Sequence, residues 1–167
     1  TRLSHSLGVY YLGRQILLSL SKKSEELPFT EKGMMSFLVA CLLHDIGHFP
    51  YAHSLKELAI RDHEELAGEM ILEREELGKA IENTGADREM TAAIIDKDLL
   101  TSDDETLFYR NVLSGTLDPD KLDYLSRDGF FAGVPYGKQD TDFIISFFAY
   151  RNSRLCIDKA AISSVEQ

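Results

Sequence analysis

An uninterrupted apolar run, FLVACLL at residues 37–43, is followed directly by a histidine and an aspartate. A helix that is apolar on every side must have other elements packed around it. Thr30 stands where such a helix would begin, because a threonine side chain can accept a hydrogen bond from the first backbone N–H groups. The run therefore predicts a buried helix in a helical protein, with polar chemistry gathered at its C-terminal end.

Periodic apolar residues and capping signals predict helices along most of the chain. Asp62 and Glu65 form a capping box, Asp118 is an N-cap followed by Pro119, and Gly129 is expected to end the helix that starts there. The helices are expected at about residues 2–20, 63–73, 75–83, 88–96, 104–113 and 119–127, with a short one beginning near Tyr51. A strand is expected at about residues 153–158.

These elements predict an all-α fold, a helical bundle with at most a minor β-hairpin near the C-terminus. No repeat, low-complexity tract or linker divides the sequence, so we expect residues 1–167 to form a single domain. The chain begins inside a helical pattern at Thr1 and stops at Gln167 just after another helix start. We therefore expect it to be a fragment of a longer protein.

Charge and cysteine content exclude several classes of function. The formal net charge is -10, which disfavours nonspecific binding to nucleic acid or anionic lipid. Cys41 and Cys156 give neither a disulfide framework nor a CxxC zinc motif. No apolar run approaches the ~20 residues that span a bilayer, and no signal peptide is recognisable. We expect a soluble cytoplasmic protein.

The histidines are the residues that most strongly indicate chemistry. There are five, and each falls in or beside a predicted helix end: His5, His44, His48, His53 and His63. Burying such groups together with Asp45 is costly unless a bound ion stabilises them. Mixed imidazole and carboxylate donors suit Mn, Fe, Co, Ni or Zn better than calcium. The cluster predicts a divalent metal site.

Three blocks of sequence, RLSHSLGV, LLHDIGHFPYAH and LDPDKLDYLSRD, resemble the HD-domain phosphohydrolases, and within them the deoxynucleoside triphosphate triphosphohydrolase (dGTPase-like) branch. The resemblance implies a metal held by His5, His44, Asp45 and Asp120, with Mg²⁺ as a further candidate ion. Asp118 is the alternative carboxylate. Helical periodicity favours Asp120, which shares one face with Lys121, Tyr124 and Asp128.

The resemblance also implies roles for the residues around the metal. Arg2, Lys121, Tyr124 and Asp128 would line the pocket for the triphosphate and sugar, and His48, His53 and His63 would surround the reacting phosphorus, with His53 as general acid. Arg127 is interpreted instead as a solvated helix charge. Lys56 departs from the family pattern, because relatives often carry an acidic residue there.

We therefore expect a metal-dependent enzyme that hydrolyses a deoxynucleoside triphosphate to deoxynucleoside and triphosphate. A second Mg²⁺ could enter with the substrate, and the resemblance implies a homo-oligomer. Two alternatives stay open. One is another HD phosphohydrolase, such as a nucleotidase or cyclic-nucleotide phosphodiesterase, and the other is a nucleotide-binding sensor with vestigial hydrolysis.

Overall fold

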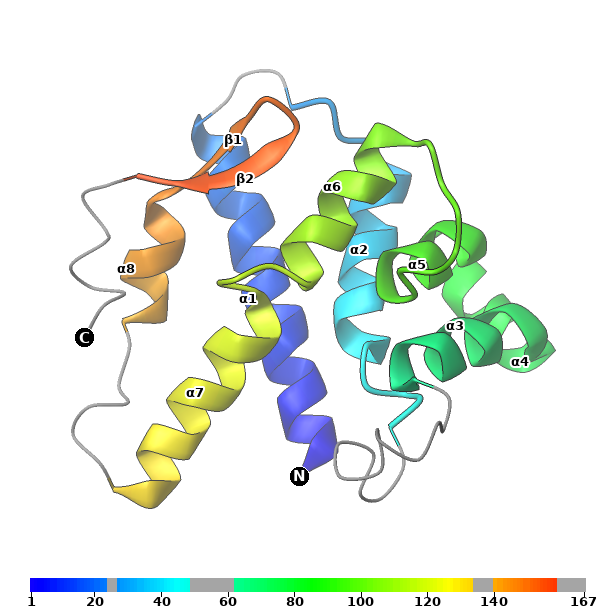
Figure 1. Cartoon of the computed structure of the whole chain (residues 1–167), viewed down its shortest axis with the longest axis horizontal. Coiled ribbons are helices and arrows are strands. Elements are labelled where there is room, and N and C mark those ends of the chain that lie inside the picture. The colour runs from blue at the N-terminus through cyan, green and yellow to red at the C-terminus, as the bar shows by residue number, and fades with distance from the viewer. Residues whose placement is uncertain (24–26, 49–61, 134–139, 159–167) are drawn as a thin grey trace. The chain divides into compact units, whose positions relative to one another are not determined.

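The computed structural model describes residues 1–23, 27–48, 62–133 and 140–158. Within these ranges the chain forms eight helices and one antiparallel pair of strands (Figure 1). The predicted all-α fold with a minor hairpin near the C-terminus is confirmed. In the same ranges, no helix has the length and hydropathy needed to cross a membrane.

The chain divides into two compact units, and the second is inserted into the first. Unit 1 comprises Thr1–Pro28 and Asn111–Gln167, and unit 2 comprises Phe29–Arg110. Unit 2 contains the apolar helix from which the fold was predicted.

The described residues of unit 2 form five helices, and the last of them, α6, continues three residues past the unit boundary. They are α2 (Glu31–Leu43), α3 (His63–Glu73), α4 (Glu75–Glu82), α5 (Arg88–Ile95) and α6 (Asp104–Leu113). The predicted N-cap residues are confirmed: Thr30 accepts a bond from the backbone N–H of Gly33, and Asp62 from that of Glu64. The part of Glu65 in the capping box stays a prediction. These polar side chains satisfy N–H groups that a helix leaves unpaired at its start.

Aromatic side chains fill the core of unit 2. The rings of Phe37 and Tyr109 stack with centroids 4.8 Å apart, and Phe29 stacks on Phe108 at 4.9 Å. Burial raises the pKa of the Tyr109 hydroxyl, and the nearby Glu105 carboxylate adds to that rise. Helix α5 packs against both α2 and α3, so these two helices share a common neighbour.

Unit 1 is organised around its first helix. It contains α1 (Arg2–Lys23), α7 (Pro119–Ala132), α8 (Thr141–Ser146), β1 (Phe148–Arg151) and β2 (Arg154–Ile157). Helix α1 packs against α7, α8 and β1. The buried apolar residues Val9, Ile16 and Leu20 recur along it at helical spacing. Unit 1 therefore depends on contacts between residues more than 100 positions apart in the sequence.

The strand predicted at residues 153–158 is confirmed as β2. The position of its hairpin partner β1 was not predicted, and neither was the short helix α8. Arg151 pairs with Arg154, so only Asn152 and Ser153 form the turn. Both have positive φ, 51° and 59°, as a two-residue turn matching the strand twist requires.

The predicted end of α7 is wrong. Gly129 is buried within the helix, which continues to Ala132 and stops at Gly133. Gly133 adopts the left-handed conformation with φ 66°, and its N–H bonds back to the last turn. A glycine at that position terminates a helix without the steric penalty of a Cβ. Packing of Gly129 overrides the local signal that a glycine gives in the sequence.

Candidate active site

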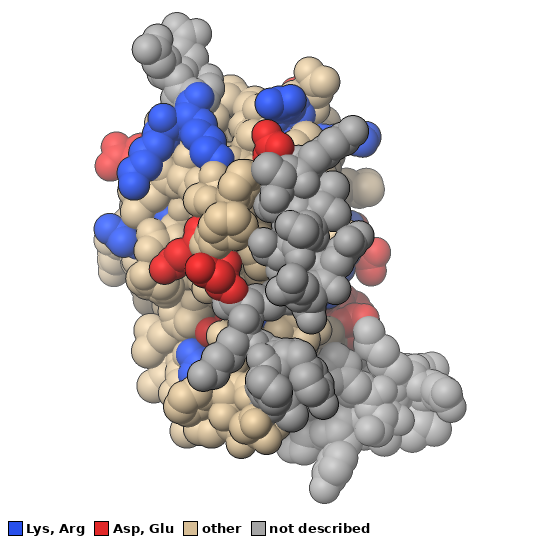
Figure 2. Space-filling view, turned by 90° about the vertical axis from the view of Figure 1, so that its left-hand side faces the viewer, with Lys and Arg blue, Asp and Glu red and all other residues tan. Residues whose placement is uncertain are grey.

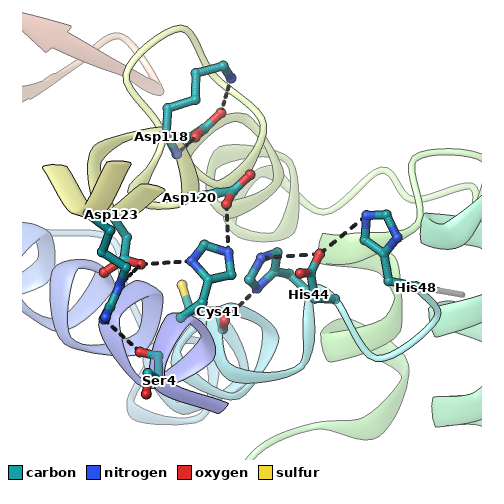
Figure 3. Close-up of polar contacts among 11 residues, drawn as sticks. Ser4, Cys41, His44, His48, Asp118, Asp120 and Asp123 are labelled. Atoms are coloured by element: carbon teal, nitrogen blue, oxygen red, sulfur yellow. Dashed lines mark hydrogen bonds and ion pairs between the residues drawn. The ribbon is translucent and has the colours of Figure 1, made fainter. Parts of the chain in front are cut away.

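In unit 1, His5 of α1 faces α7 and contacts two carboxylates of that helix. Its Nε2 lies 2.9 Å from Asp120 Oδ1, and its Nδ1 lies 2.7 Å from Asp123 Oδ2 (Figure 3). A neutral imidazole has only one N–H, so it can donate to only one of them. The other nitrogen then requires a proton or a cation between it and the carboxylate.

Asp120 and Asp118 have different surroundings, and the difference agrees with the sequence argument. Asp118 is the buried N-cap of α7 and accepts a bond from the backbone N–H of Lys121. Burial raises the pKa of Asp118, and its hydrogen bond to Lys121 opposes that rise. Of these two carboxylates, Asp120 is the one that lies beside His5. The capping role predicted for Asp118 is confirmed.

The Lys121 ammonium pairs with Asp118, and it also donates to the carbonyl oxygen of Gly115 at 2.9 Å. The other predicted substrate-binding residues lie on the same two helices: Arg2 begins α1, and Tyr124 and Asp128 follow on α7. All three are exposed to solvent. Their roles remain predictions.

Arg127 is not simply a solvated helix charge. Its Nε donates to Asp123 Oδ2 at 2.6 Å, and a terminal guanidinium nitrogen donates to the carbonyl oxygen of Ser4 at 2.7 Å (Figure 3). The hydrogen bond to Asp123 raises the pKa of the guanidinium. Asp123 was not singled out from the sequence. The spacing of Asp123 and Arg127, one helical turn apart, was the available signal.

In unit 2, His44 and Asp45 lie at the C-terminal end of α2. His44 Nδ1 lies 2.9 Å from the carbonyl oxygen of Cys41, one turn earlier in the helix (Figure 3). When Nδ1 donates this bond, the neutral ring carries its lone pair on Nε2, which lies 3.5 Å from Asp45 Oδ1. Cys41 itself is fully buried, and burial raises the pKa of its thiol, so its backbone rather than its sulfur serves the site.

Two further histidines lie beside Asp45 in the same unit. The rings of His48 and His63 stack with centroids 4.4 Å apart. His63 Nδ1 is 2.9 Å from Asp62 Oδ1, and His48 Nε2 is 4.0 Å from Asp45 Oδ1. One donor atom each of Asp45, His48 and His63 can be chosen so that all lie within 4.8 Å of one another. The structure thus groups three of the predicted residues.

Gly47 explains how the turn after α2 approaches α3 so closely. A Cβ at this position would overlap the carbonyl oxygen of His63 and lie 2.6 Å from the backbone nitrogen of Ala67. Both obstacles are backbone atoms, which cannot rotate away. Only a glycine lets this turn and the first turn of α3 come together, and that approach accompanies the stacking of His48 on His63.

The donor pairs of each unit fit a divalent ion. Imidazole nitrogens and carboxylate oxygens bind such ions at about 2.0–2.2 Å, so two adjacent ligand atoms lie roughly 3–3.5 Å apart. The distances within the His5–Asp120 and His44–Asp45 pairs, 2.9 Å and 3.5 Å, are compatible with that spacing. Metal-binding histidines almost always donate their other N–H to a carboxylate or carbonyl oxygen, as both rings can here.

Three predicted features lie outside the described residues. They are His53, the expected general acid, and Lys56, the departure from the family pattern, together with the helix expected near Tyr51. His5 and Asp120 belong to unit 1, and His44 and Asp45 to unit 2. The structure therefore describes two donor pairs, one in each unit.

The charge of the protein is unevenly distributed over its surface. On the face shown in Figure 2, several Lys and Arg side chains lie toward the top and a group of Asp and Glu side chains lies below them, with further charged side chains of both signs interspersed.

The HD domain family matches residues 2–127. Over 99% of its length the chain is 28% identical to the uncharacterized protein YwfO of Bacillus subtilis, and over 80% it is 27% identical to a deoxynucleoside triphosphate triphosphohydrolase SAMHD1 homolog of Dictyostelium discoideum. A crystal structure of a phosphohydrolase from Bacteroides thetaiotaomicron matches 99% of the chain with a TM-score of 0.78 and 30% identity.

The chain spans only part of each of these proteins. It covers 37% of YwfO, 27% of the Dictyostelium protein and 39% of the Bacteroides structure.

Proposed function

The chain belongs to the HD domain family, and on that premise we propose that the full-length protein is a metal-dependent phosphohydrolase acting on deoxynucleoside triphosphates. The observation that carries the proposal is the similar setting of two histidines. His5 and His44 each have Nδ1 within hydrogen-bonding distance of a protein oxygen and Nε2 beside a carboxylate.

The proposed metal ligands are those expected from the sequence: His5, His44, Asp45 and Asp120. A bound divalent ion supplies a Lewis acid that activates water and polarises phosphate oxygens. Its identity lies among Mn, Fe, Co, Ni, Zn and Mg, because the donors are two imidazoles and two carboxylates.

The remaining residues bind the substrate and move protons. A nucleoside triphosphate carries about four negative charges, which Arg2 and Lys121 would offset locally in a protein that is acidic overall. His53 would protonate the leaving 5′-oxygen, since imidazole titrates in the range that general-acid work requires. His48 and His63, stacked beside Asp45, would position water and stabilise developing charge.

The choice of a deoxynucleoside triphosphate rests on the similarity to the Dictyostelium triphosphohydrolase homolog. Cleavage at the α-phosphorus releases the whole triphosphate, whereas other HD activities release orthophosphate or open a cyclic phosphate. The products therefore test the proposal directly. The full-length protein should be incubated with each deoxynucleotide and each candidate metal, and the products separated by ion-exchange chromatography. Intact triphosphate supports the proposal, and orthophosphate alone contradicts the proposed substrate class.

The metal assignment has its own test. Replacing Asp45 with Ala should remove most bound metal, because a metal ligand is lost. The helix content should be unchanged, because Asp45 is not part of the buried apolar core. Changes to outer partners of metal sites typically cost ~10- to 100-fold in affinity, so loss of a ligand should cost more. Elemental analysis after dialysis measures the retained metal. Asp142→Ala, which removes an exposed carboxylate in the first turn of α8, is the matched control. Full metal retention by Asp45→Ala would contradict the assignment.

A further inference from the structure

Asp123 and Arg127 form a connected pair on α7 that ends on His5. Asp123 Oδ2 lies 2.7 Å from His5 Nδ1 and accepts a bond from Arg127 Nε at 2.6 Å. Arg127 in turn donates to the carbonyl oxygen of Ser4, the residue before His5. The histidine is thus held through its ring and through the neighbouring backbone by the same two side chains.

The surroundings of these groups show that the pair is built into the packing of unit 1. The Asp123 side chain is only 9% exposed, so its charge requires compensation, and Arg127 provides it. A carboxylate that accepts from Nδ1–H fixes the imidazole tautomer and strengthens Nε2 as a donor.

Gly8 provides an independent sign that α1 accommodates this pair. A Cβ at Gly8 would overlap Asp123 Oδ1 and lie 2.7 Å from an Arg127 guanidinium nitrogen. Glycine inside a helix is unfavourable relative to alanine. Its presence in the middle of α1 is explained by the space that Asp123 and Arg127 occupy.

We propose that Asp123, held in place by Arg127, is a positioning residue that presents His5 Nε2 to the metal. The corresponding partner of His44 Nδ1 is a neutral carbonyl oxygen, so the two histidines would differ in donor strength. This inference rests on the metal site of the proposed function. It concerns metal affinity and ligand geometry, and it does not depend on which phosphoester is cleaved.

The test is a titration of the full-length, metal-free protein with Co²⁺ alone, followed by visible absorption. The absorption gives the dissociation constant, and its band positions report the geometry of the ligands. Asp123→Ala should bind Co²⁺ about 100-fold more weakly with altered bands, and Asp123→Asn about 10-fold more weakly, because an amide oxygen can still accept the Nδ1–H bond. Asp142→Asn is the charge-matched control and should titrate like the wild type.

A purely structural role for Asp123 gives a different pattern, because the pair also joins α1 to α7. In that case both variants would unfold at lower temperature, yet the folded proteins would bind Co²⁺ with unchanged affinity and bands, which would overturn the inference. Gly8→Ala provides a second variant, which removes no ligand and adds a Cβ that would overlap the pair. It should also weaken Co²⁺ binding, and wild-type affinity in this variant would count against the inference.

The outcomes also separate this inference from the proposed function. Co²⁺ binding that depends on Asp123, in a protein that releases no triphosphate, would support the positioning role and reject the proposed substrate. Triphosphate release together with Co²⁺ binding that is unaffected by changes at Asp123 would support the proposed substrate and reject the positioning role. A wild-type protein that binds no Co²⁺ would reject the positioning role, because there would be no ligand to position.

Discussion

At the scale of single residues, the contacts of Lys121 link stability to the proposed substrate pocket. Its ammonium pairs with the buried Asp118 carboxylate, whose pKa burial already raises above the ordinary 3.8. If Lys121 turns toward a substrate phosphate, Asp118 keeps only its backbone bond at the start of α7. The lysine thus has two competing partners, one within the protein and one in the ligand.

Lys121→Met should therefore destabilise the protein by about 1–3 kcal/mol at neutral pH, the usual cost of leaving a buried acceptor without its partner. Because burial raises the pKa of Asp118, its ionised form is disfavoured in the folded state. The loss of stability in Lys121→Met should shrink as the pH falls through that raised pKa, because Asp118 is then protonated with or without Lys121. Urea unfolding at neutral and acidic pH measures both effects.

The control for this variant is Lys79→Met, which removes an exposed lysine paired with Glu75 at 3.1 Å. Exposed pairs of this kind contribute about 0.3–0.5 kcal/mol. Equal losses of stability in the two variants would show that the pairing of Lys121 with Asp118 contributes no more to stability than an exposed ion pair does.

At the scale of elements, the N-cap of α6 illustrates how a single carboxylate fixes where a helix starts. Asp103 Oδ2 accepts bonds from the Thr106 hydroxyl at 2.6 Å and the Thr106 backbone N–H at 2.8 Å. These bonds, the hydroxyl first, lower the pKa of Asp103 below 3.8. Their contribution is therefore fully present above pH ~4 and is lost as the pH falls through the lowered pKa.

Asp103→Ala should lower the free energy of unfolding by about 1 kcal/mol at neutral pH, a typical effect of losing an N-cap. The difference from wild type should shrink as the pH falls through the lowered pKa of Asp103, as measured by chemical denaturation over a pH series. The neighbouring Asp104→Ala removes a charge from the first turn without removing the bonds to Thr106, so it should cost less. A pH-independent loss in Asp103→Ala would contradict the capping account.

Helices with clear local signals were predicted well from sequence. Thr30, Asp62 and Asp118 each mark a start that the structure confirms, because a cap depends only on residues within one turn. The positions of α8, with six residues, and β1 were missed; both pack against α1, which lies far earlier in the sequence. The link between Asp123 and His5 joins residues 118 positions apart, and no local pattern reports it.

At the scale of the whole molecule, metal binding should be visible as stability. A ligand that binds only the folded state stabilises it by about 2.7 kcal/mol when its concentration is 100 times its dissociation constant. Adding Mn²⁺ or Co²⁺ to the metal-free, full-length protein should therefore raise its unfolding midpoint in a concentration-dependent way. Differential scanning calorimetry measures this shift, and Asp45→Ala should abolish it. An equal shift in that variant would place the ion at another site.

The insertion of unit 2 into unit 1 has a consequence for protein synthesis. A nascent chain leaves the ribosome from its N-terminus, so residues 29–110 emerge complete while α1 still lacks α7, α8 and the hairpin, which follow after residue 118. Unit 2 can fold at that moment, since domains fold as units during translation. The apolar side of α1 therefore lacks these C-terminal partners until they have been translated.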